Sequence, residues 1–270
     1  MIYPLLKLLG SDYSIGVVTY VKRFDTYFKP LVKQLENYFP NVEKNYVLNG
    51  HYDQIAQEKY LNEAKELLKK TTAKNVVAYK ENQCLSRCWN QLILHSKARK
   101  VLILNDDITI RALFRPCLES QIWLYATFTI NRSWSHFVIS KDVIKKVGWF
   151  EERFPANGME DADYALRMAL AFGYKIMPKL HHNNIFCFGL TNIVAKNEDP
   201  GWKKYSASID NKFASVNAEF LEKKWQKSKL LTPNSVYAFN EAYFSLSPNM
   251  ETPQFYDFKF LDNPLKSPLK

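Results

Sequence analysis

The sequence lacks the features that would mark a disulfide-stabilised or membrane-spanning chain. Its 270 residues include only four cysteines, and a chain of this length can bury a sufficient core without a disulfide framework. Cys84 and Cys88 have no second Cys/His pair at zinc-finger spacing, so a structural zinc ion is not expected. The leucines among the first ten residues form patches too short for a signal peptide or a transmembrane helix. We therefore expect reduced cysteines and a cytoplasmic location.

The sequence also lacks a dense basic segment, although its formal net charge is +10. Lysines occur in pairs such as Lys69-Lys70 and Lys145-Lys146, at spacings typical of solvated helix faces. A basic nucleic-acid-binding module would cluster such residues with stacking aromatic side chains, and only the net charge supports that alternative. We expect no nucleic-acid partner, and we keep open a peripheral contact with an anionic membrane surface.

No glycine lies between Thr19 and Arg23, directly after the first expected strand. A nucleotidyltransferase would usually have a glycine-rich, basic loop there to hold a triphosphate, and a dinucleotide- or methyl-donor-binding domain would also need glycines. The absence disfavours these classes. A nucleotidyltransferase acting on a sugar phosphate stays an alternative, because it too would place acidic residues beyond a parallel sheet.

Hydrophobic patterning predicts an α/β fold. Short β-branched or apolar runs alternate with segments of helical periodicity. We expect strands at 15–21, 45–49, 75–79 and 101–104, and helices at 27–39, 54–71 and 84–96. Four strands that alternate with three helices indicate a mostly parallel central sheet flanked by helices on both faces.

The alternation ends after Asp107. We expect a strand at 121–130, helices at 141–147 and 162–172, and a strand at 174–177. Residues 190–270 are rich in aromatic residues and show helical periodicity around 214–230. Because no repeat and no linker is evident, we predict a main domain at 1–189 and an aromatic-rich C-terminal extension at 190–270 that packs on it.

Two groups of acidic residues are candidates for catalysis. The first, Asn105-Asp106-Asp107, directly follows the strand at 101–104, and ligands of open parallel sheets bind outside the carboxyl ends of the strands. Mg²⁺ and Mn²⁺ prefer oxygen ligands and often share them with a diphosphate. Asp107 is therefore a candidate metal ligand, and Asp106 a candidate contact for ribose or sugar hydroxyls. A polar turn would explain the same residues.

The second group, Glu160-Asp161-Ala162-Asp163, opens the helix expected at 162–172. Acidic residues in the first turn of a helix are stabilised by the helix dipole, which is a sufficient structural explanation. The catalytic explanation is that a carboxylate within hydrogen-bond reach of an incoming hydroxyl acts as a general base. We predict this role for Asp161, with Glu160 and Asp163 orienting the acceptor or its neighbours.

Four sequence elements, taken in order, resemble a known enzyme family. Residues 101–108 (Val-Leu-Ile-Leu-Asn-Asp-Asp-Ile) resemble the strand and DxD element of GT-A glycosyltransferases. Residues 135–154, with a Gly-Trp-Phe-Glu-Glu-Arg-Phe end, are similar to their acceptor-side segment, which 160–163 (Glu-Asp-x-Asp) continues. The Glu-Asn and Arg-x-x-Asn residues within 81–90 are similar to an upstream stretch of the same enzymes. In order and spacing, residues 14–188 resemble the inverting family 2 glycosyltransferases.

This resemblance implies a GT-A type nucleotide-diphospho-sugar transferase fold and a sugar transfer that depends on Mn²⁺ or Mg²⁺. The donor would be a nucleotide-diphosphate sugar, and the acceptor a glycan or a lipid-linked or protein-linked group. Asp107 and one of His181 or His182 would bind the metal, Asp161 would be the catalytic base, and Trp149 would form an aromatic wall for the acceptor sugar. The pocket for the base and the ribose would be lined by Thr19, Tyr20, Arg23 and Asn49, and Arg87 would lie near the diphosphate.

The sequence departs from the family pattern at two places. Asn105 occupies the first DxD position, where aspartate is usual, and this leaves the metal affinity open. Residues 49–53 read Asn-Gly-His-Tyr-Asp where an Asp-x-Ser-x-Asp run is more usual, and this leaves the base preference open. His136 is expected in the donor site or in the core.

Overall fold

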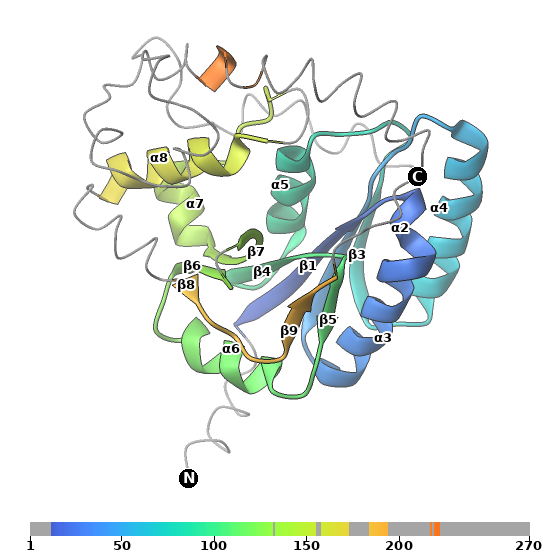
Figure 1. Ribbon diagram of the computed structural model, residues 1–270, viewed down its shortest axis with the longest axis horizontal. Helices are drawn as coiled ribbons and strands as arrows, with labels where there is room; N and C mark the ends of the chain where they lie inside the picture. The colour runs from blue at the N-terminus through green and yellow to red at the C-terminus, as the bar shows by residue number, and fades with distance from the viewer. Residues whose placement is uncertain are drawn as a thin grey trace.

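The computed structural model describes residues 12–131, 133–154, 158–172, 184–193, 217 and 219–221. A seven-stranded sheet with the order β3-β2-β1-β4-β7-β6-β8 forms its centre (Figure 1). The strands are β1 (Tyr13–Thr19), β2 (Glu43–Leu48), β3 (Ala73–Ala78), β4 (Lys100–Asn105), β6 (Thr127–Ile130), β7 (Ser133–Ser140) and β8 (Asn184–Ile185). Only β7 runs antiparallel to its neighbours among these described strands. The predicted mostly parallel sheet is confirmed.

The parallel strands β1 to β4 end at the same edge of the sheet, which we call the carboxyl edge. It is defined by the residues that directly follow these strands: Tyr20, Asn49, Tyr79 and Asp106. Thr19 pairs with Leu48, and Val18 pairs with Asn105, so the chain segments that leave β1, β2 and β4 are close together. Any side chains with a chemical role that follow these strands are thereby brought into one region.

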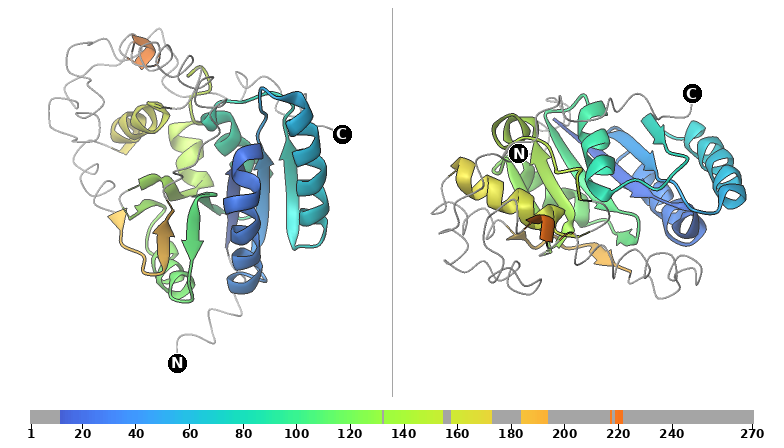
Figure 2. Two further views of the ribbon diagram at one scale, coloured as in Figure 1. Left: turned by 45° about the vertical axis from the view of Figure 1, so that its right-hand side comes forward. Right: turned by 90° about the horizontal axis from the view of Figure 1, so that it is seen from above.

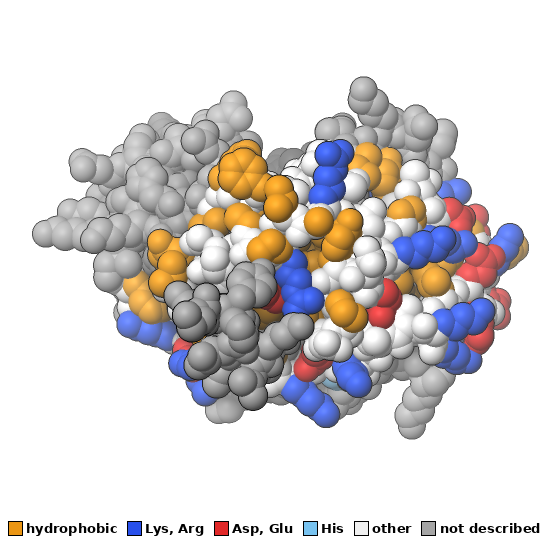
Figure 3. All heavy atoms as spheres, turned by 90° about the horizontal axis from the view of Figure 1, so that it is seen from below, with side chains coloured by type: hydrophobic (Ala, Val, Ile, Leu, Met, Phe, Trp, Pro, Cys, Tyr) orange, Lys and Arg blue, Asp and Glu red, His pale blue; other side chains and the backbone are white. Residues whose placement is uncertain are grey.

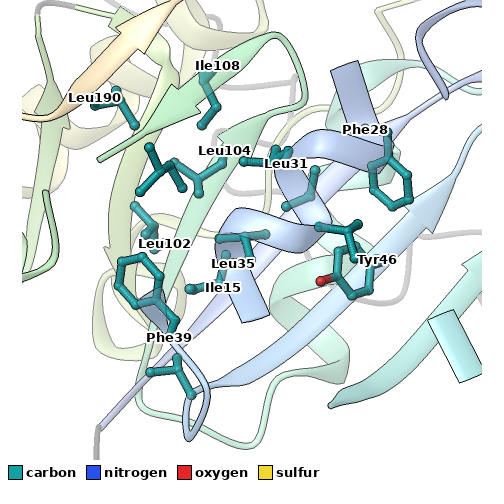
Figure 4. Packing of buried hydrophobic residues seen from close by; sticks show 14 of the residues in the cluster. Ile15, Phe28, Leu31, Leu35, Phe39, Tyr46, Leu102, Leu104, Ile108 and Leu190 are labelled. Carbon is teal, nitrogen blue, oxygen red and sulfur yellow. The ribbon is translucent and has the colours of Figure 1, made fainter. Parts of the chain in front are cut away.

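Helices cover both faces of the sheet, as the patterning predicts. One face packs against α3 (Lys29–Tyr38), α4 (Gln54–Lys69) and α6 (Phe114–Ile122), and the other against α5 (Leu85–His95), α7 (Lys141–Val147) and α8 (Glu160–Phe172). The chain enters α3 through α2 (Val21–Arg23) and the π-helical turn η1 (Phe24–Phe28). Helices α3 and α4 lie side by side (Figures 1 and 2). In Figure 4, Leu102 and Leu104 of the sheet pack towards Leu31 and Leu35 of α3.

A second, two-stranded sheet follows the carboxyl edge. It consists of β5 (Ile108–Ile110) and β9 (Leu190–Asn192), which pair antiparallel. The Ile193 amide donates to the carbonyl of Asp107 at 2.7 Å, and the Arg111 amide donates to the carbonyl of Gly189 at 2.7 Å. The backbone that carries Asp107 is therefore held from a segment more than 80 residues away in the sequence.

Local sequence signals explain where the elements begin and meet. The side chains of Asp53 and Ser140 cap α4 and α7 by accepting hydrogen bonds from backbone amides, at 3.0 and 3.3 Å. Gly50 lies so close to the loop after β3 that a Cβ there would be 2.0 Å from the carbonyl carbon of Glu81. The glycine therefore allows the loops after β2 and β3 to touch at the carboxyl edge.

The prediction of a strand at 121–130 is wrong in its first half. Residues up to Ile122 belong to α6, whose Phe114, Leu118 and Ile122 are buried at four-residue spacing, and the strand β6 begins at Thr127. Residues 122–126 are all apolar, and periodicity cannot separate a helix end from a strand in so short a run. The strand β7 was not expected, and the strand expected at 174–177 lies outside the described residues.

The division into domains at 189 and 190 stays a prediction. Within the described residues, Leu190–Asn192 pairs with β5 of the main domain, and the Asn217 side chain donates to the carbonyl of Gly158 at 3.0 Å. Most of the predicted extension lies outside the described residues. Among the helices that are described, none combines the length and the hydrophobicity that crossing a bilayer requires.

Candidate active site

A buried ion pair lies at the carboxyl edge, where β1 and β4 end. Asp106 is 1% exposed, and its two carboxylate oxygens accept hydrogen bonds from Thr19 Oγ1 at 2.7 Å and Arg23 Nη1 at 2.9 Å. The guanidinium also approaches Asp107, with Nη1 3.4 Å from Oδ2. Burial raises the pKa of Asp106, and the opposing effects of Arg23 and Thr19 reduce this shift. Three residues predicted at the donor site therefore contact one another.

The turn after β1 aims Arg23 at this point. Tyr20 precedes α2 in an extended conformation, and its carbonyl accepts a hydrogen bond from the Arg23 amide at 3.0 Å. The Arg23 guanidinium also lies 5.7 Å from the centre of the Tyr20 ring, within the range of a cation–π interaction. Tyr20 is thus beside the Arg23–Asp106 pair, as the sequence predicts for a donor-site residue.

Asp107 differs from Asp106 in accessibility. Its side chain is 20% exposed, against 2% for Asp106. One or two protein carboxylates together with substrate phosphates usually suffice to bind Mg²⁺. The chemistry of Asp107 therefore fits a divalent cation shared with a diphosphate. No group of three or more His, Cys, Asp or Glu residues suited to a metal occurs within the described part of the chain, and His181 and His182 lie outside it.

His136 is placed in the core beside this region. It lies on β7 opposite Leu104 of β4 and is 1% exposed. Burial lowers the pKa of His136, and the Asp107 carboxylate is near enough to act in the opposite direction. His136 is therefore buried in the sheet behind the acidic group.

Asn49 joins the loops after β2 and β3. Its Oδ1 accepts hydrogen bonds from the amides of Gly50 and Gln83, both at 2.9 Å, and its Nδ2 donates to Asn82 Oδ1 and to the carbonyl of Gln83 at 3.1 and 3.0 Å. The Asn49 amide also donates to the carbonyl of Thr19 at 2.8 Å. Asn49 is at the carboxyl edge as predicted, where its side chain holds the two loops together.

Arg87 takes part in a network with an acid that the sequence analysis missed. Arg87 Nε donates to Glu152 Oε2 at 2.8 Å, and Asn90 Nδ2 donates to Glu152 Oε1 at 2.9 Å. Asn90 also accepts from the Phe150 amide at 3.0 Å. The Arg-x-x-Asn motif therefore fastens α5 to the segment after α7. The adjacent Glu151-Glu152 pair was the available signal for this contact.

The three acids at the start of α8 have different environments. Glu160 is 5% exposed and accepts from the Gly158 amide at 2.5 Å. Burial, with a further contribution from Asp161, raises the pKa of Glu160 to about 8. Asp161 is partly exposed, and its Oδ1 accepts from the Ala162 amide at 2.9 Å. Asp163 forms a fully buried ion pair with Arg167 at 2.8 Å.

The first turn of α8 lies near the start of α5. Burial raises the pKa of Cys84, the residue that precedes α5, to about 12, and the nearby negative charges of Glu152 and Glu160 contribute to this shift. In Figure 1, the end of α8 that lies nearer to α5 is its first turn. Trp149 is partly buried and packs against the core under these helices. Because α5 follows β3, the second acidic group is on the side of the molecule where the parallel strands end.

Comparisons with known proteins find structural likeness only. No family model and no curated protein matches the sequence. Among solved structures, the chain is similar to S. aureus TarS (TM-score 0.46, 14% identity, 59% of this chain and 33% of that chain). It is also similar to TarS 1–349 in complex with UDP-GlcNAc (TM-score 0.46, 15% identity, 59% and 53%).

A further similar structure is the mannosyltransferase PcManGT from Pyrobaculum calidifontis in complex with GDP-Man and Mn²⁺ (TM-score 0.45, 13% identity, 71% of this chain and 59% of that chain). The matched region thus covers between 33% and 59% of these three structures. A likeness at this identity concerns the fold and transfers no activity to this chain.

Proposed function

We propose that the chain is a metal-dependent glycosyltransferase of the GT-A type, which moves a sugar from a nucleotide-diphosphate sugar to an acceptor hydroxyl with inversion. The observation that carries this proposal is the placement of two acidic groups at the end of the sheet where ligands of open α/β folds bind. Asp106-Asp107 directly follows β4 beside Arg23, and Glu160-Asp161 opens α8 near the start of α5.

On the donor side, we propose that Arg23, which the resemblance places at the base and the ribose, contacts the diphosphate instead, together with a cation held by Asp107. The buried Asp106 fixes the guanidinium of Arg23, so the positive charge is already in place before a ligand binds. A planar guanidinium suits phosphate oxygens because it offers several donors in one plane. Asp107 would hold the Mn²⁺ or Mg²⁺, which when bound would stabilise the negative charge of the departing diphosphate.

The remaining donor-site assignments follow from position. Thr19, Tyr20 and Asn49 are at the carboxyl edge next to Arg23, which supports a role in binding the base and the ribose. Arg87 lies in the first turn of α5, with its guanidinium held by Glu152. We propose that Arg87 contributes positive potential near the diphosphate and that one of His181 or His182 adds a ligand to the cation.

On the acceptor side, the proposal assigns the general base to Asp161. Glu160 has a pKa of about 8, so most of its carboxyl groups are protonated at neutral pH, and a protonated carboxyl cannot accept the proton of a hydroxyl. Asp163 is engaged by Arg167 inside the protein, so we assign it a positioning role instead of a direct acceptor contact. Trp149 would form the aromatic wall for the acceptor.

The proposed reaction is a single displacement at the anomeric carbon. The acceptor oxygen forms a bond to this carbon on the face opposite the diphosphate, while the bond from the carbon to the phosphate oxygen breaks and its electron pair stays on the diphosphate. The hydroxyl proton passes to Asp161. One displacement inverts the configuration, and a second catalytic acid is not needed when the charge of the leaving group is neutralised electrostatically.

Thermal unfolding with a panel of nucleotide sugars tests this proposal, because a ligand that binds only the folded state raises the unfolding temperature. We expect at least one UDP- or GDP-sugar to stabilise the protein in the presence of Mn²⁺, and to do so less after EDTA is added. The same compound should be hydrolysed slowly when no acceptor is present. If no nucleotide sugar in the panel stabilises the protein and none is hydrolysed, the proposed function is wrong.

A further inference from the structure

Exposed apolar side chains gather around α6, away from the carboxyl edge. They come from the two ends of the helix and from the loop between β8 and β9: Leu113, Trp123, Leu124, Phe186 and Phe188, with exposed fractions of 66%, 48%, 70%, 66% and 64%. We call these five residues the α6 patch. Single exposed hydrophobic residues are common, whereas a group of large ones marks an interaction site.

The aromatic part of the patch is held in place by the backbone. Cys187 is 1% exposed, and its amide donates to Asn131 Oδ1 at 2.9 Å. Its neighbours Phe186 and Phe188 are exposed on either side of it and lie with their ring centres 5.5 Å apart. The Arg111 amide fastens the end of the same loop to the start of α6 by donating to Gly189. The two rings therefore stay at the surface in a defined arrangement.

The other end of the patch lies where β4 begins. Trp123 and Leu124 directly follow α6, and the ammonium group of Lys100, the first residue of β4, donates to the carbonyls of Ile122 and Tyr125. Asp106 follows the last residue of β4, six residues after Lys100, so this end of the patch is roughly 20 Å from the candidate site, at about 3.3 Å per residue. In Figure 1, α6 is at the lower end of the molecule.

The lower side of the molecule combines apolar and charged surface. Figure 3 views this side and shows hydrophobic side chains spread over it, with Lys and Arg and also Asp and Glu side chains among and beside them. Arg111 is exposed next to Leu113, whereas Glu119 of α6 is already engaged by Tyr13 and Arg115. Arg115 is paired with Glu119, so the positive charge beside the patch comes from Arg111 before α6 and from Lys100 at the start of β4. An anionic surface would attract these two residues.

We propose that the α6 patch binds the surface of a lipid bilayer that contains anionic lipids. Large exposed side chains of Trp, Phe and Leu with neighbouring basic residues are the combination that favours the membrane–water interface.

A second copy of the chain fits the α6 patch less well than a bilayer does. Five large side chains that are half to two-thirds exposed amount to roughly 600 Å², at about 200 Å² for each side chain. A stable interface between proteins usually buries about 800 Å² on each partner. Two copies with a formal charge of +10 each would also repel one another, whereas the same charge attracts a negative bilayer.

Co-sedimentation of the whole chain with vesicles tests the proposal. We expect the protein to bind vesicles that contain phosphatidylglycerol more tightly than vesicles of phosphatidylcholine only. The double variant Trp123→Ser/Leu124→Ser should lose about tenfold or more of this affinity, because burial of two large apolar side chains contributes to it. Phe186→Ser/Phe188→Ser provides a second, independent test. Ile55→Ser is the matched control, because Ile55 is 86% exposed on α4 outside the patch and should not affect binding.

Each outcome decides the matter. Absence of binding to anionic vesicles overturns the proposal, and so does equal binding by wild type and by both double variants that keep the wild-type unfolding temperature. If light scattering shows that the wild type is a dimer and that the patch variants are monomers, the patch binds a second copy of the chain instead. Nucleotide-sugar stabilisation is measured in parallel and should be unchanged by the patch variants, so failure here is separate from failure of the proposed transferase activity.

Discussion

Asp106 and Glu160 are both buried acids on the side of the molecule where the parallel strands end, but their surroundings differ. Asp106 has the guanidinium of Arg23 at 2.9 Å and the hydroxyl of Thr19 at 2.7 Å, which favour its charged form against the effect of burial. Glu160 has the like charge of Asp161 as its neighbour, and its pKa rises to about 8.

The comparison shows that two buried carboxyl groups can serve different functions because their surroundings differ. A carboxylate that accepts hydrogen bonds from a guanidinium and a hydroxyl is held in position and holds the cation in turn, which suits a site for phosphates and a metal. A carboxyl group that keeps its proton leaves its neighbour Asp161 as the group that can accept one. Environments that separate the pKa values of neighbouring acids are typical of catalytic sites. The variants that follow test this separation.

The largest expected effect is on the transfer reaction. Asp161→Asn should lower the transfer rate by about 10²- to 10⁴-fold, the usual contribution of a general base, with nearly unchanged nucleotide-sugar affinity. Initial rates and calorimetric titration would measure both quantities. Asp142→Asn is the control, because Asp142 is an exposed acid in the first turn of α7 and should leave the rate unchanged. Near wild-type transfer by Asp161→Asn would show that the base has been assigned to the wrong residue.

Next in size is the effect on the stability of α8, the helix that carries Asp161, the proposed base. Asp163→Asn leaves the buried charge of Arg167 without its carboxylate, and removal of one partner of a buried ion pair costs about 3–5 kcal/mol of unfolding free energy. Urea unfolding would measure this loss. Glu66→Gln, which removes a surface ion pair with Lys69, should have no measurable effect. If the two variants have the same unfolding free energy, the Asp163–Arg167 ion pair does not stabilise α8.

Glu160→Gln tests the raised pKa through the pH dependence of stability. Between its ordinary value of 4.5 and about 8, the folded protein holds a proton that the unfolded chain has released. The unfolding free energy of the wild type should therefore fall as the pH rises through this window, by roughly 1.4 kcal/mol per pKa unit at most. Urea unfolding over the window should give a flatter profile for Glu160→Gln. Parallel profiles would contradict a proton on Glu160.

The smallest expected effect is on donor binding. Asp107→Ala should weaken binding of a nucleotide sugar in the presence of Mn²⁺ by about tenfold, which corresponds to ~1.4 kcal/mol. Calorimetric titration with and without Mn²⁺ would measure it. Asp25→Ala is the control, because Asp25 is a highly exposed acid that pairs with Lys29. If the heat that depends on Mn²⁺ is the same in Asp107→Ala as in the wild type, Asp107 is not the ligand.

The first half of the fold could be predicted because its sequence signals are local. Each of the strands β1 to β4 is a short apolar run, and a helix with clear periodicity follows each of the first three. The order of strands then brings Thr19, Arg23 and Asp106 together, since β1 and β4 are neighbours. Contacts such as Arg87 with Glu152 and Asp163 with Arg167 could not be predicted as pairs, because side-chain partners depend on how the helices pack.

The second half was harder to predict for a physical reason. Residues 122–126, which join the end of α6 to the start of β6, are all apolar, and so short a run does not distinguish the period of a helix from that of a strand. Strands β5 and β9 are only three residues long and pair over a long sequence separation. The roles of His181 and His182, and the arrangement of most of residues 190–270, stay predictions.

A crystal structure with Mn²⁺ and the nucleotide sugar that most stabilises the protein tests the central claim most directly. The account predicts anomalous density for Mn²⁺ beside the Asp107 carboxylate, with the diphosphate near Arg23 and the Asp161 carboxylate on the opposite face of the anomeric carbon. A nucleotide sugar bound away from the carboxyl edge, or an Asp161 side chain that faces a different surface from the bound sugar, would contradict it.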